Sequence, residues 1–327
     1  MSGQGWLSAS EAGERMGIDR RTVSLYIAEG KLPAQRTAGG HYRIAEAVIE
    51  AFLRNGAGAH TRPAPHVFAV VHHAGGVGKT TTVLNLGYSL AQAGHRVLLV
   101  DLDPQADLSD RRLGLQPVAP TLVDVLIAGE GTPAPVPIKW GNGVGIEVIP
   151  TSLDQAAFDL RLAGVAIGRE RRLSEALAGL PAEAYDYVLI DCPPNLSLVT
   201  TNALYAADGI IIPIQAQDKA YQHLPLVLDS IREVQKYRRR ESPDPLHPLP
   251  ALFGIVVTMT ERTVMAREVE EQLRAGYGSL VFQTTIPRRT ELALDDRHRA
   301  PVGVYAPAGQ GDIAYRALAE EVIHRAR

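Results

Sequence analysis

The chain has 327 residues, of which 46% are hydrophobic and 21% charged, and its formal net charge is −3. This composition is that of a globular protein, and the length allows one large domain or two. The only cysteine, Cys192, excludes a disulfide framework, an all-cysteine zinc site and a thiolate-bridged iron–sulfur cluster. The N-terminus lacks the pattern of a secretory signal and the apolar runs are too short to cross a bilayer, so we expect a cytoplasmic protein.

Charge is distributed unevenly along the chain. Residues 1–65 contain eight Lys and Arg against six Asp and Glu, residues 66–234 eleven against eighteen, and residues 235–327 fourteen against twelve. The near-neutral average therefore covers an acidic middle between two mildly basic ends. Basic ends favour contacts with nucleic acid, which the net charge alone would argue against.

The first 54 residues are typical of a small DNA-binding domain. We predict a helix over residues 7–16, a turn, and a second helix over residues 20–28 that is capped by Asp19. This spacing indicates a helix-turn-helix, whose second helix enters the major groove. Gly39 and Gly40 permit a tight hairpin that would form a wing, and a third helix follows over residues 45–53.

Arginine, threonine, histidine and tyrosine side chains on these elements suit phosphates and base edges. The candidates are Arg20, Arg21, Thr22 and Tyr26 on the second helix, and Arg36, His41 and Arg43 on the hairpin. The alternative interpretation is a helical docking module. Residues 39–44, GGHYRI, also resemble the winged helix-turn-helix of the MerR/excisionase type, which favours DNA binding. One such module makes few contacts, so stable specific binding would need a dimer.

Residues 55–65 form a linker of small residues with two prolines, and residues 66–327 form a second domain. In this domain short apolar strands alternate with helical stretches. We predict strands at 68–71, 96–102, 187–190, 209–214 and 252–258, and a helix at 79–93. Strands of near-continuous Val, Ile and Leu predict an α/β fold with a mostly parallel sheet flanked by helices. The Pro-rich segments 133–140 and 242–250 are predicted to be loops.

A glycine-rich loop lies between the first predicted strand and the helix at 79–93. Backbone N–H groups of such a loop curl around phosphates, and the helix N-terminus adds partial positive charge. Lys79 would reach the terminal phosphates and the Thr80 hydroxyl would bind Mg²⁺. A strict P-loop would have glycine at His73, and the alternative is a turn that binds no nucleotide. The nucleotide candidates are Gly75, Gly76, Val77, Gly78, Lys79, Thr80 and Thr81.

Three carboxylates follow predicted strands. Asp101 and Asp103 are two residues apart, so they share one face of an extended chain, and Asp191 ends a second apolar strand. Both strand ends belong at the carboxyl edge of the sheet, where such folds bind ligands. We interpret the three as a metal and water shell rather than as loop caps, and Cys192 as a small, half-buried filler.

From His66 onward the chain resembles the ParA family of partition ATPases, part of the deviant-Walker group that includes the MinD cell-division ATPases. The matching segments are GGVGKTTTVLNL, VDLDPQAD, YDYVLIDCPPNLSLVTTNALYAAD, IIPIQ, GIVVTMTERT and TIPRRTELA. The resemblance implies a P-loop ATPase fold with ATP or ADP and Mg²⁺ as cofactors. It implies that Lys79 and Asp103 act in catalysis, with Asp103 orienting the attacking water. It further implies that Thr80, Asp101 and Asp191 hold Mg²⁺, and that Pro287 and Arg288 contact adenine.

The resemblance also implies partners. The family forms an ATP-dependent homodimer that coats DNA, and a centromere-binding ParB-like protein stimulates hydrolysis. Arg262 and Arg289 are the DNA-contact candidates in this domain. The chain would be nucleoid-associated, and the N-terminal domain would add site-specific DNA binding and autoregulation. Because the positive excess is small, we expect DNA affinity that depends on dimerisation and falls steeply with salt.

Three positions depart from the family pattern, and one of the milder changes is Gln217, which stands where the family often has Glu. Ala74 replaces a signature lysine that reaches the partner's phosphates, a kind of donor worth ~2.7–4 kcal/mol in other enzymes. Another cation such as Lys219 or a nearby arginine substitutes, or hydrolysis is slow, or the alanine is an engineered replacement. Glu291 stands where the family commonly has a basic DNA-contacting residue, which weakens the expectation of non-specific DNA binding. The arginines nearby could compensate: Arg288, Arg289, Arg297 and Arg299.

Two other functions remain as alternatives. A nucleotide-responsive transcription regulator with weakened or absent hydrolysis fits Ala74 and the winged module. A membrane-positioning ATPase of the MinD type would need an amphipathic tail, whereas residues 313–327 end without one. We therefore expect this last helix to pack on the sheet and the protein to have no membrane partner.

Overall fold

The computed structural model describes residues 6–16, 32–37, 41–46, 65–151, 161–181, 183–217, 224–241 and 250–326, with the single positions 20, 23, 24, 27, 48 and 49. Contacts within the chain divide it into two compact units, Met1–Arg62 and Pro63–Arg327. Each unit has a hydrophobic core of its own.

The first unit contains a small antiparallel sheet and a helix. Its strands β1 (Trp6–Ser8), β3 (Tyr42–Ala45) and β2 (Gln35–Arg36) lie in that order, and α1 spans Ala9–Met16. The pairing of Gln35 with Arg43 confirms the predicted hairpin. The first helix begins at Ala9, two residues later than predicted, because Leu7 pairs with Ile44 in the sheet.

The rest of the predicted DNA reader is only partly described. Arg20, Val23, Ser24 and Ile27 are helical, whereas most of the predicted second helix and the Gly39-Gly40 turn lie outside the described residues. The described core of this unit consists of six apolar side chains: Ala12, Met16, Val23, Leu32, Ile44 and Ile49.

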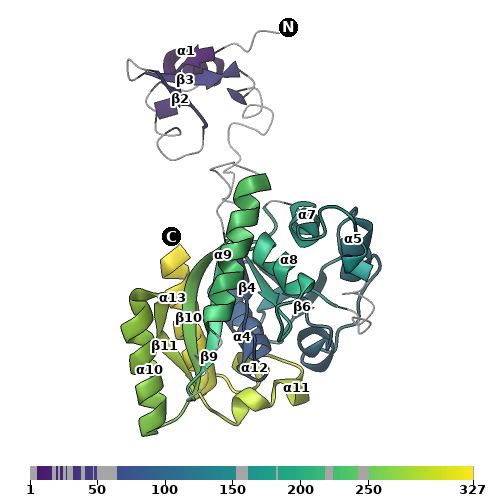
Figure 1. The fold of residues 1–327 in the computed structure, drawn as a ribbon, viewed down its shortest axis with the longest axis vertical. Coiled ribbons are helices and arrows are strands. Elements are labelled where there is room, and N and C mark those ends of the chain that lie inside the picture. Colours follow the sequence, from purple (N-terminus) through teal and green to yellow (C-terminus); the bar gives the residue numbers. More distant parts are fainter. Residues whose placement is uncertain are drawn as a thin grey trace. The chain divides into compact units, whose positions relative to one another are not determined.

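The second unit is built on an eight-stranded sheet (Figure 1). The strand order is β11-β10-β9-β4-β8-β5-β7-β6, and all neighbours are parallel except β6 and β7. This confirms the expected mostly parallel α/β sheet. The strands are β4 (His66–Val70), β5 (Val97–Asp101), β6 (Val136–Lys139), β7 (Gly145–Ile149), β8 (Tyr187–Asp191), β9 (Gly209–Gln215), β10 (Ala251–Thr260) and β11 (Val281–Pro287).

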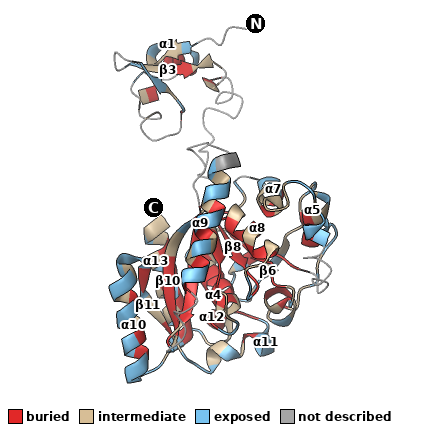
Figure 2. Ribbon diagram, viewed as in Figure 1, coloured by how far each residue is buried: buried red, intermediate tan, exposed pale blue. Residues whose placement is uncertain are grey.

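Successive side chains of a strand point to opposite faces, so each apolar strand places side chains on both faces of the sheet. Helices cover both faces. Phe68 and Val70 of β4 join one core, while Ala69 and the following Val71 join the other. The first core lies under α4 (Lys79–Gln92), α12 (Val302–Tyr305) and α13 (Gln310–Ala326). The second lies under α5 (Leu122–Ala128), α7 (Arg172–Ala178), α8 (Leu198–Ala206), α9 (Leu224–Glu241) and α10 (Val264–Tyr277) (Figure 2).

The five strands and the helix predicted for this unit are confirmed, each within about two residues of its bounds. The prediction of a loop at 133–140 is wrong, because Val136–Lys139 forms β6. This strand lies at the edge of the sheet and pairs only with β7, and an edge strand tolerates the missing N–H of Pro137. Residues 242–249 of the other Pro-rich segment lie outside the described residues.

The last helix, α13, packs on α4 and β11 as expected. Its buried side chains are Tyr315, Leu318, Ala319 and Val322. Among the helices that the structure describes, none is both long and apolar enough to cross a membrane.

Candidate nucleotide-binding site

The loop between β4 and α4 has the backbone of an anion cradle. Gly76 and Gly78 have φ angles of +75° and +92°, a left-handed region that strains any residue with a Cβ. Gly78 is also the N-cap of α4 and supplies no side-chain cap. The first N–H groups of this 14-residue helix are therefore left for an anion to satisfy.

Lys79 is held at this loop by its own chain. Its ammonium group donates a hydrogen bond of 3.0 Å to the carbonyl oxygen of Ala74, and only 6% of the residue is exposed. Burial lowers the pKa of Lys79, while the negative charges of Asp191 and Asp103 act in the opposite direction. Because burial disfavours the charged form of Lys79, an anionic ligand in the adjacent cavity would stabilise its ammonium group.

β10 supports the loop from the other side. The Thr258 hydroxyl donates a 2.8 Å hydrogen bond to the carbonyl oxygen of Val77, and both residues are almost fully buried. The next residue, Met259, has a φ of +52° and lies on the wall of the cavity beside the loop. Neither Thr258 nor Met259 was predicted as part of the site, because nothing in their spacing connects them to the loop.

Asp191 is the least satisfied carboxylate of the site. It is completely buried at the end of β8, and neither of its oxygens has a hydrogen-bond partner among the described residues. Burial raises the pKa of Asp191 well above its ordinary value and the charge of Asp101 adds to this. The nearby Thr80 side chain lowers the same pKa.

Asp101, in contrast, has its oxygens occupied. One accepts the Asp103 N–H at 3.0 Å, and the other accepts the N–H and the hydroxyl of Ser109 at 2.9 and 2.7 Å. Burial raises the pKa of Asp101 to about 7 despite these bonds. Asp101 thus fixes the turn that carries Asp103.

Asp103 lines the cavity beside the glycine loop. One of its oxygens accepts the Gln105 N–H at 3.0 Å. Burial raises its pKa, whereas Gln105 and the Lys79 cation lower it. The Asp103 carboxylate is therefore oriented by its own turn.

These elements surround a cavity of about 770 Å³, large enough for a nucleotide. Most of the predicted nucleotide residues line it: Gly75, Gly76, Gly78, Lys79, Thr80, Thr81, Asp103, Pro287 and Arg288. Val77, Asp101 and Asp191 are not on its wall. Arg112 and Tyr315, which were not predicted, are on it.

The side chains available as metal ligands suit Mg²⁺ better than a metal ion that is coordinated by protein groups alone. Among the described residues no three His, Cys, Asp or Glu side chains converge as ligands. Mg²⁺ characteristically uses one or two carboxylates together with substrate phosphates and water. The unpartnered oxygens of Asp191, close to Thr80 and the anion cradle, fit that pattern.

The candidate DNA contacts of this unit lie in different surroundings. Arg262 is exposed just before α10. Arg289 lines the cavity and donates to the Gln310 side chain at 2.6 Å. Glu291 accepts the Gly311 N–H at 2.6 Å in the first turn of α13. The acidic residue at position 291 therefore satisfies a helix N-terminus.

The DNA candidates of the first unit are partly described. Arg20, Arg36, His41 and Arg43 are exposed. Arg43 also lies 3.8 Å from the Glu11 carboxylate. Arg21, Thr22 and Tyr26 lie outside the described residues, as does Lys219 of the second unit.

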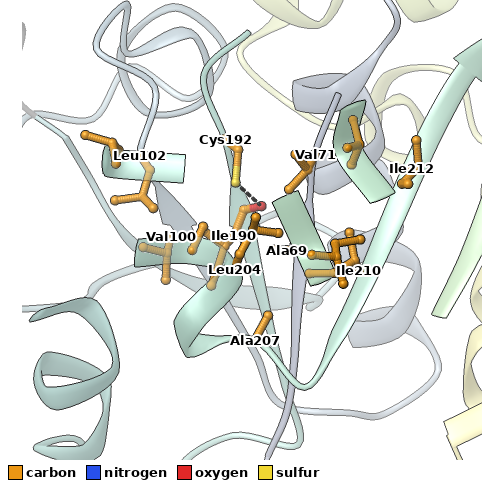
Figure 3. Packing of buried hydrophobic residues seen from close by; sticks show 14 of the residues in the cluster. Ala69, Val71, Val100, Leu102, Ile190, Cys192, Leu204, Ala207, Ile210 and Ile212 are labelled. Atoms are coloured by element: carbon orange, nitrogen blue, oxygen red, sulfur yellow. Dashed lines mark hydrogen bonds between the residues drawn. The ribbon is translucent and has the colours of Figure 1, made fainter. Parts of the chain in front are cut away.

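Cys192 is buried more deeply than expected. It is completely buried, not half-buried, and lies among Val71, Leu102 and Ile190 (Figure 3). Burial raises the pKa of its thiol well above the ordinary value. This supports its interpretation as a structural filler of the core.

Comparison with known proteins identifies the family. Residues 65–242 match the family model described as an AAA domain, and residues 6–57 match that of a helix-turn-helix domain. Over 259 residues the chain is 40% identical to the chromosome-partitioning ATPase Soj of Thermus thermophilus, covering 79% of this chain and 95% of that protein. The chain belongs to the ParA/Soj family of partition ATPases. This ParA/Soj-family chain is also 37% identical over 264 residues to the chromosome partitioning protein ParA of Caulobacter vibrioides, covering 80% of this chain and 95% of that protein.

Solved structures share the fold of this ParA/Soj-family chain. Cobyrinic acid a,c-diamide synthase from Mycobacterium smegmatis, with bound ATP analog and magnesium, is 33% identical with a TM-score of 0.66. The match covers 80% of this chain and 96% of that one. The cell division ATPase MinD of Pyrococcus furiosus, at 24% identity and a TM-score of 0.59, covers 79% and 98% and shows the fold alone.

Proposed function

We propose that this protein binds ATP and Mg²⁺ in the cavity beside α4, hydrolyses the ATP, and uses that cycle in DNA partition. The observation that carries the proposal is the meeting of the glycine cradle, Lys79 and Asp103 on one cavity wall, with Asp191 buried close to Lys79. The ATP analog and magnesium bound to the Mycobacterium smegmatis relative support the choice of ligand.

Each side chain has a role that follows from its surroundings. The N–H groups of the loop and the Lys79 ammonium would bind phosphate oxygens, and Lys79 would exchange its bond to Ala74 for them. Asp191 and Thr80 would hold Mg²⁺, which when bound neutralises phosphate charge. Asp103 would accept a hydrogen bond from the attacking water, in the orientation that Gln105 and Asp101 set. Pro287 and Arg288 would lie against the base.

We further propose that ATP drives formation of a homodimer and that the dimer binds DNA. The exposed Arg262 would contact phosphates without sequence preference, and the exposed arginines of the first unit would contact a specific site. A centromere-binding ParB-like protein would stimulate hydrolysis.

Steady-state ATP hydrolysis tests the proposal. The protein should release phosphate from Mg-ATP above the rate of Asp103→Ala, and DNA with the partner protein should increase that rate. A rate that stays at background with DNA and partner present would exclude an ATPase cycle.

A second candidate is a nucleotide-responsive transcription regulator with little hydrolysis. The alanine at position 74, beside the cradle, favours it because an alanine supplies no cation. Ala74→Lys separates the two candidates. A partition ATPase limited by the missing cation should turn over ATP at least about tenfold faster in the variant. Unchanged turnover together with nucleotide-dependent operator binding would favour the regulator.

A further inference from the structure

Arg112 lies on the wall of the nucleotide cavity, where the sequence patterns assign it no role. It directly follows the short π-helical turn η1 (Asp107–Arg111), in the segment that begins with Asp103. Its side chain is 18% exposed, so its guanidinium group is largely withdrawn from solvent. A cation in such surroundings acts more strongly on a neighbouring charge than one on the surface.

A buried carboxylate holds one end of the guanidinium. Arg112 Nη1 donates a 2.6 Å hydrogen bond to Oδ2 of Asp295, which is fully buried in α11 (Asp295–His298). Asp295 also accepts the Tyr305 hydroxyl at 2.5 Å and the Asn85 amide at 3.4 Å. Asn85 in turn donates to the carbonyl oxygen of Thr81, one turn along α4 and on the cavity wall. This series of hydrogen bonds thus fixes Arg112 relative to the first turn of α4.

The Nε–H group of Arg112 is left without an acceptor. It is buried and has no hydrogen-bond partner among the described residues. Arg171, Arg172 and Arg274 also have a buried nitrogen of this kind, but they are not on the wall of the nucleotide cavity. Because Nε is also shielded from the cavity, a contact with a ligand falls to Nη2, which lies 3.9 Å from the Asp107 carboxylate on the same wall, beyond hydrogen-bond distance.

The other arginines of the cavity wall are engaged elsewhere. Arg288 and Arg289 are exposed, and they bond to Glu261 and Gln310 respectively. Arg112 and Lys79 are therefore the two cations of this wall that are mainly buried.

We propose that Arg112 is a nucleotide-binding residue, which donates from Nη2 to a phosphate oxygen of a nucleotide bound in the same chain. This inference rests on the proposed nucleotide site. It supplies, from within one chain, positive charge that the loop lacks at Ala74. Asp295 acts as the positioning residue that keeps the guanidinium on the cavity wall.

Competition against a fluorescent ADP analog, with Mg²⁺ present, tests this role. Arg112→Ala should weaken ADP binding at least tenfold, and Arg112→Lys should fall between it and the wild type, because lysine keeps the charge but not the planar guanidinium that bonds Asp295 and the ligand together. The matched control is Arg111→Ala, since Arg111 pairs with Asp107 and Asp296 and does not line the cavity. Its affinity for ADP should stay within twofold of the wild type.

Loss of Arg112 also leaves Asp295 buried without its cation, which could disturb the fold. The double variant Arg112→Ala with Asp295→Asn removes both charges. A ligand contact predicts that the double variant still binds ADP at least tenfold more weakly, while adenosine, which lacks phosphate, changes less than twofold. Recovery of ADP affinity in the double variant, or an equal loss for adenosine, would overturn the inference. If the wild type binds no ADP, the proposed nucleotide site itself fails.

Discussion

Asp101 and Asp191 occupy paired positions at the ends of the adjacent parallel strands β5 and β8, and both are completely buried. Their surroundings differ, because Ser109 and Asp103 donate to Asp101 whereas Asp191 has no donor among the described residues. One carboxylate thus holds the Asp103 turn, while the other remains available for a cation. Two neighbouring carboxylates of this kind are costly without a counterion.

This cost predicts a pH-dependent stability of the protein without Mg²⁺ and nucleotide. Burial raises the pKa of Asp191 in the folded protein above the value near 4 that it has in the unfolded chain. The contribution of Asp191 to the free energy of unfolding is therefore fully present below about pH 4 and is lost as the pH rises toward the folded-state pKa. Asp191→Asn removes this loss. Its free energy of unfolding, relative to the wild type, should therefore rise as the pH increases above about 4, by at most about 1.4 kcal/mol per pH unit.

Urea denaturation of both proteins in EDTA at several pH values measures this difference. Saturating Mg²⁺ and ADP should reverse the order, because the asparagine binds Mg²⁺ more weakly. A difference between the two proteins that does not change with pH would contradict the assignment of a buried, ionisable Asp191.

Lys79→Met should separate binding from stability. Methionine has a similar length, so the variant should fold, with some loss of stability because Asp191 and Asp103 lose a neighbouring cation. Nucleotide affinity should fall about 10- to 100-fold, the effect of losing a hydrogen bond from a charged group. Calorimetric titration with Mg-ADP and thermal melting check the two halves. A variant that binds normally, or that fails to fold, would contradict this role.

Thr258→Val tests the support of the loop by β10. The substitution removes the 2.8 Å bond to Val77 and leaves that buried carbonyl without a partner, which should cost about 1–3 kcal/mol of stability. Thr260→Val is the matched control, since its hydroxyl makes only a 3.4 Å contact with the Ile286 carbonyl. Equal melting temperatures for the two variants would show that the Thr258 bond does not support the loop.

Glu291→Ala tests the explanation for the acidic residue at this position. Loss of the bond to the Gly311 N–H should destabilise the protein by about 1 kcal/mol. Non-specific DNA binding should change little, because the arginines nearby are retained. Thermal melting and DNA binding at two salt concentrations measure these effects. A large gain in DNA affinity without loss of stability would instead make position 291 an electrostatic determinant of DNA binding.

The sheet and the loop were predictable because their signals are local. Runs of Val, Ile and Leu marked β5, β8 and β9, and the GGVGKTT run marked the cradle. β6 was missed because Pro137 reads as a loop residue unless the strand is known to lie at an edge. Sequence spacing could place the carboxylates, but not show that Asp101 is satisfied and Asp191 is not.

Residues that reach the site through tertiary contacts carried no such signal. Thr258 meets Val77 across 181 positions of the chain, and Arg112 meets Asp295 across 183. Only the folded sheet brings these pairs together. The same applies to Glu291, whose role depends on the start of α13.

In the proposed mechanism the cavity hydrolyses ATP and Asp103 orients the attacking water. Single-turnover phosphate release from Mg-ATP by the wild type and by Asp103→Asn tests it most directly, with Mg-ATP affinity measured on the same preparations. The two proteins should bind Mg-ATP with similar affinities, and Asp103→Asn should release phosphate at least about 100-fold more slowly. Equal rates of phosphate release, with both proteins saturated by Mg-ATP, would contradict it.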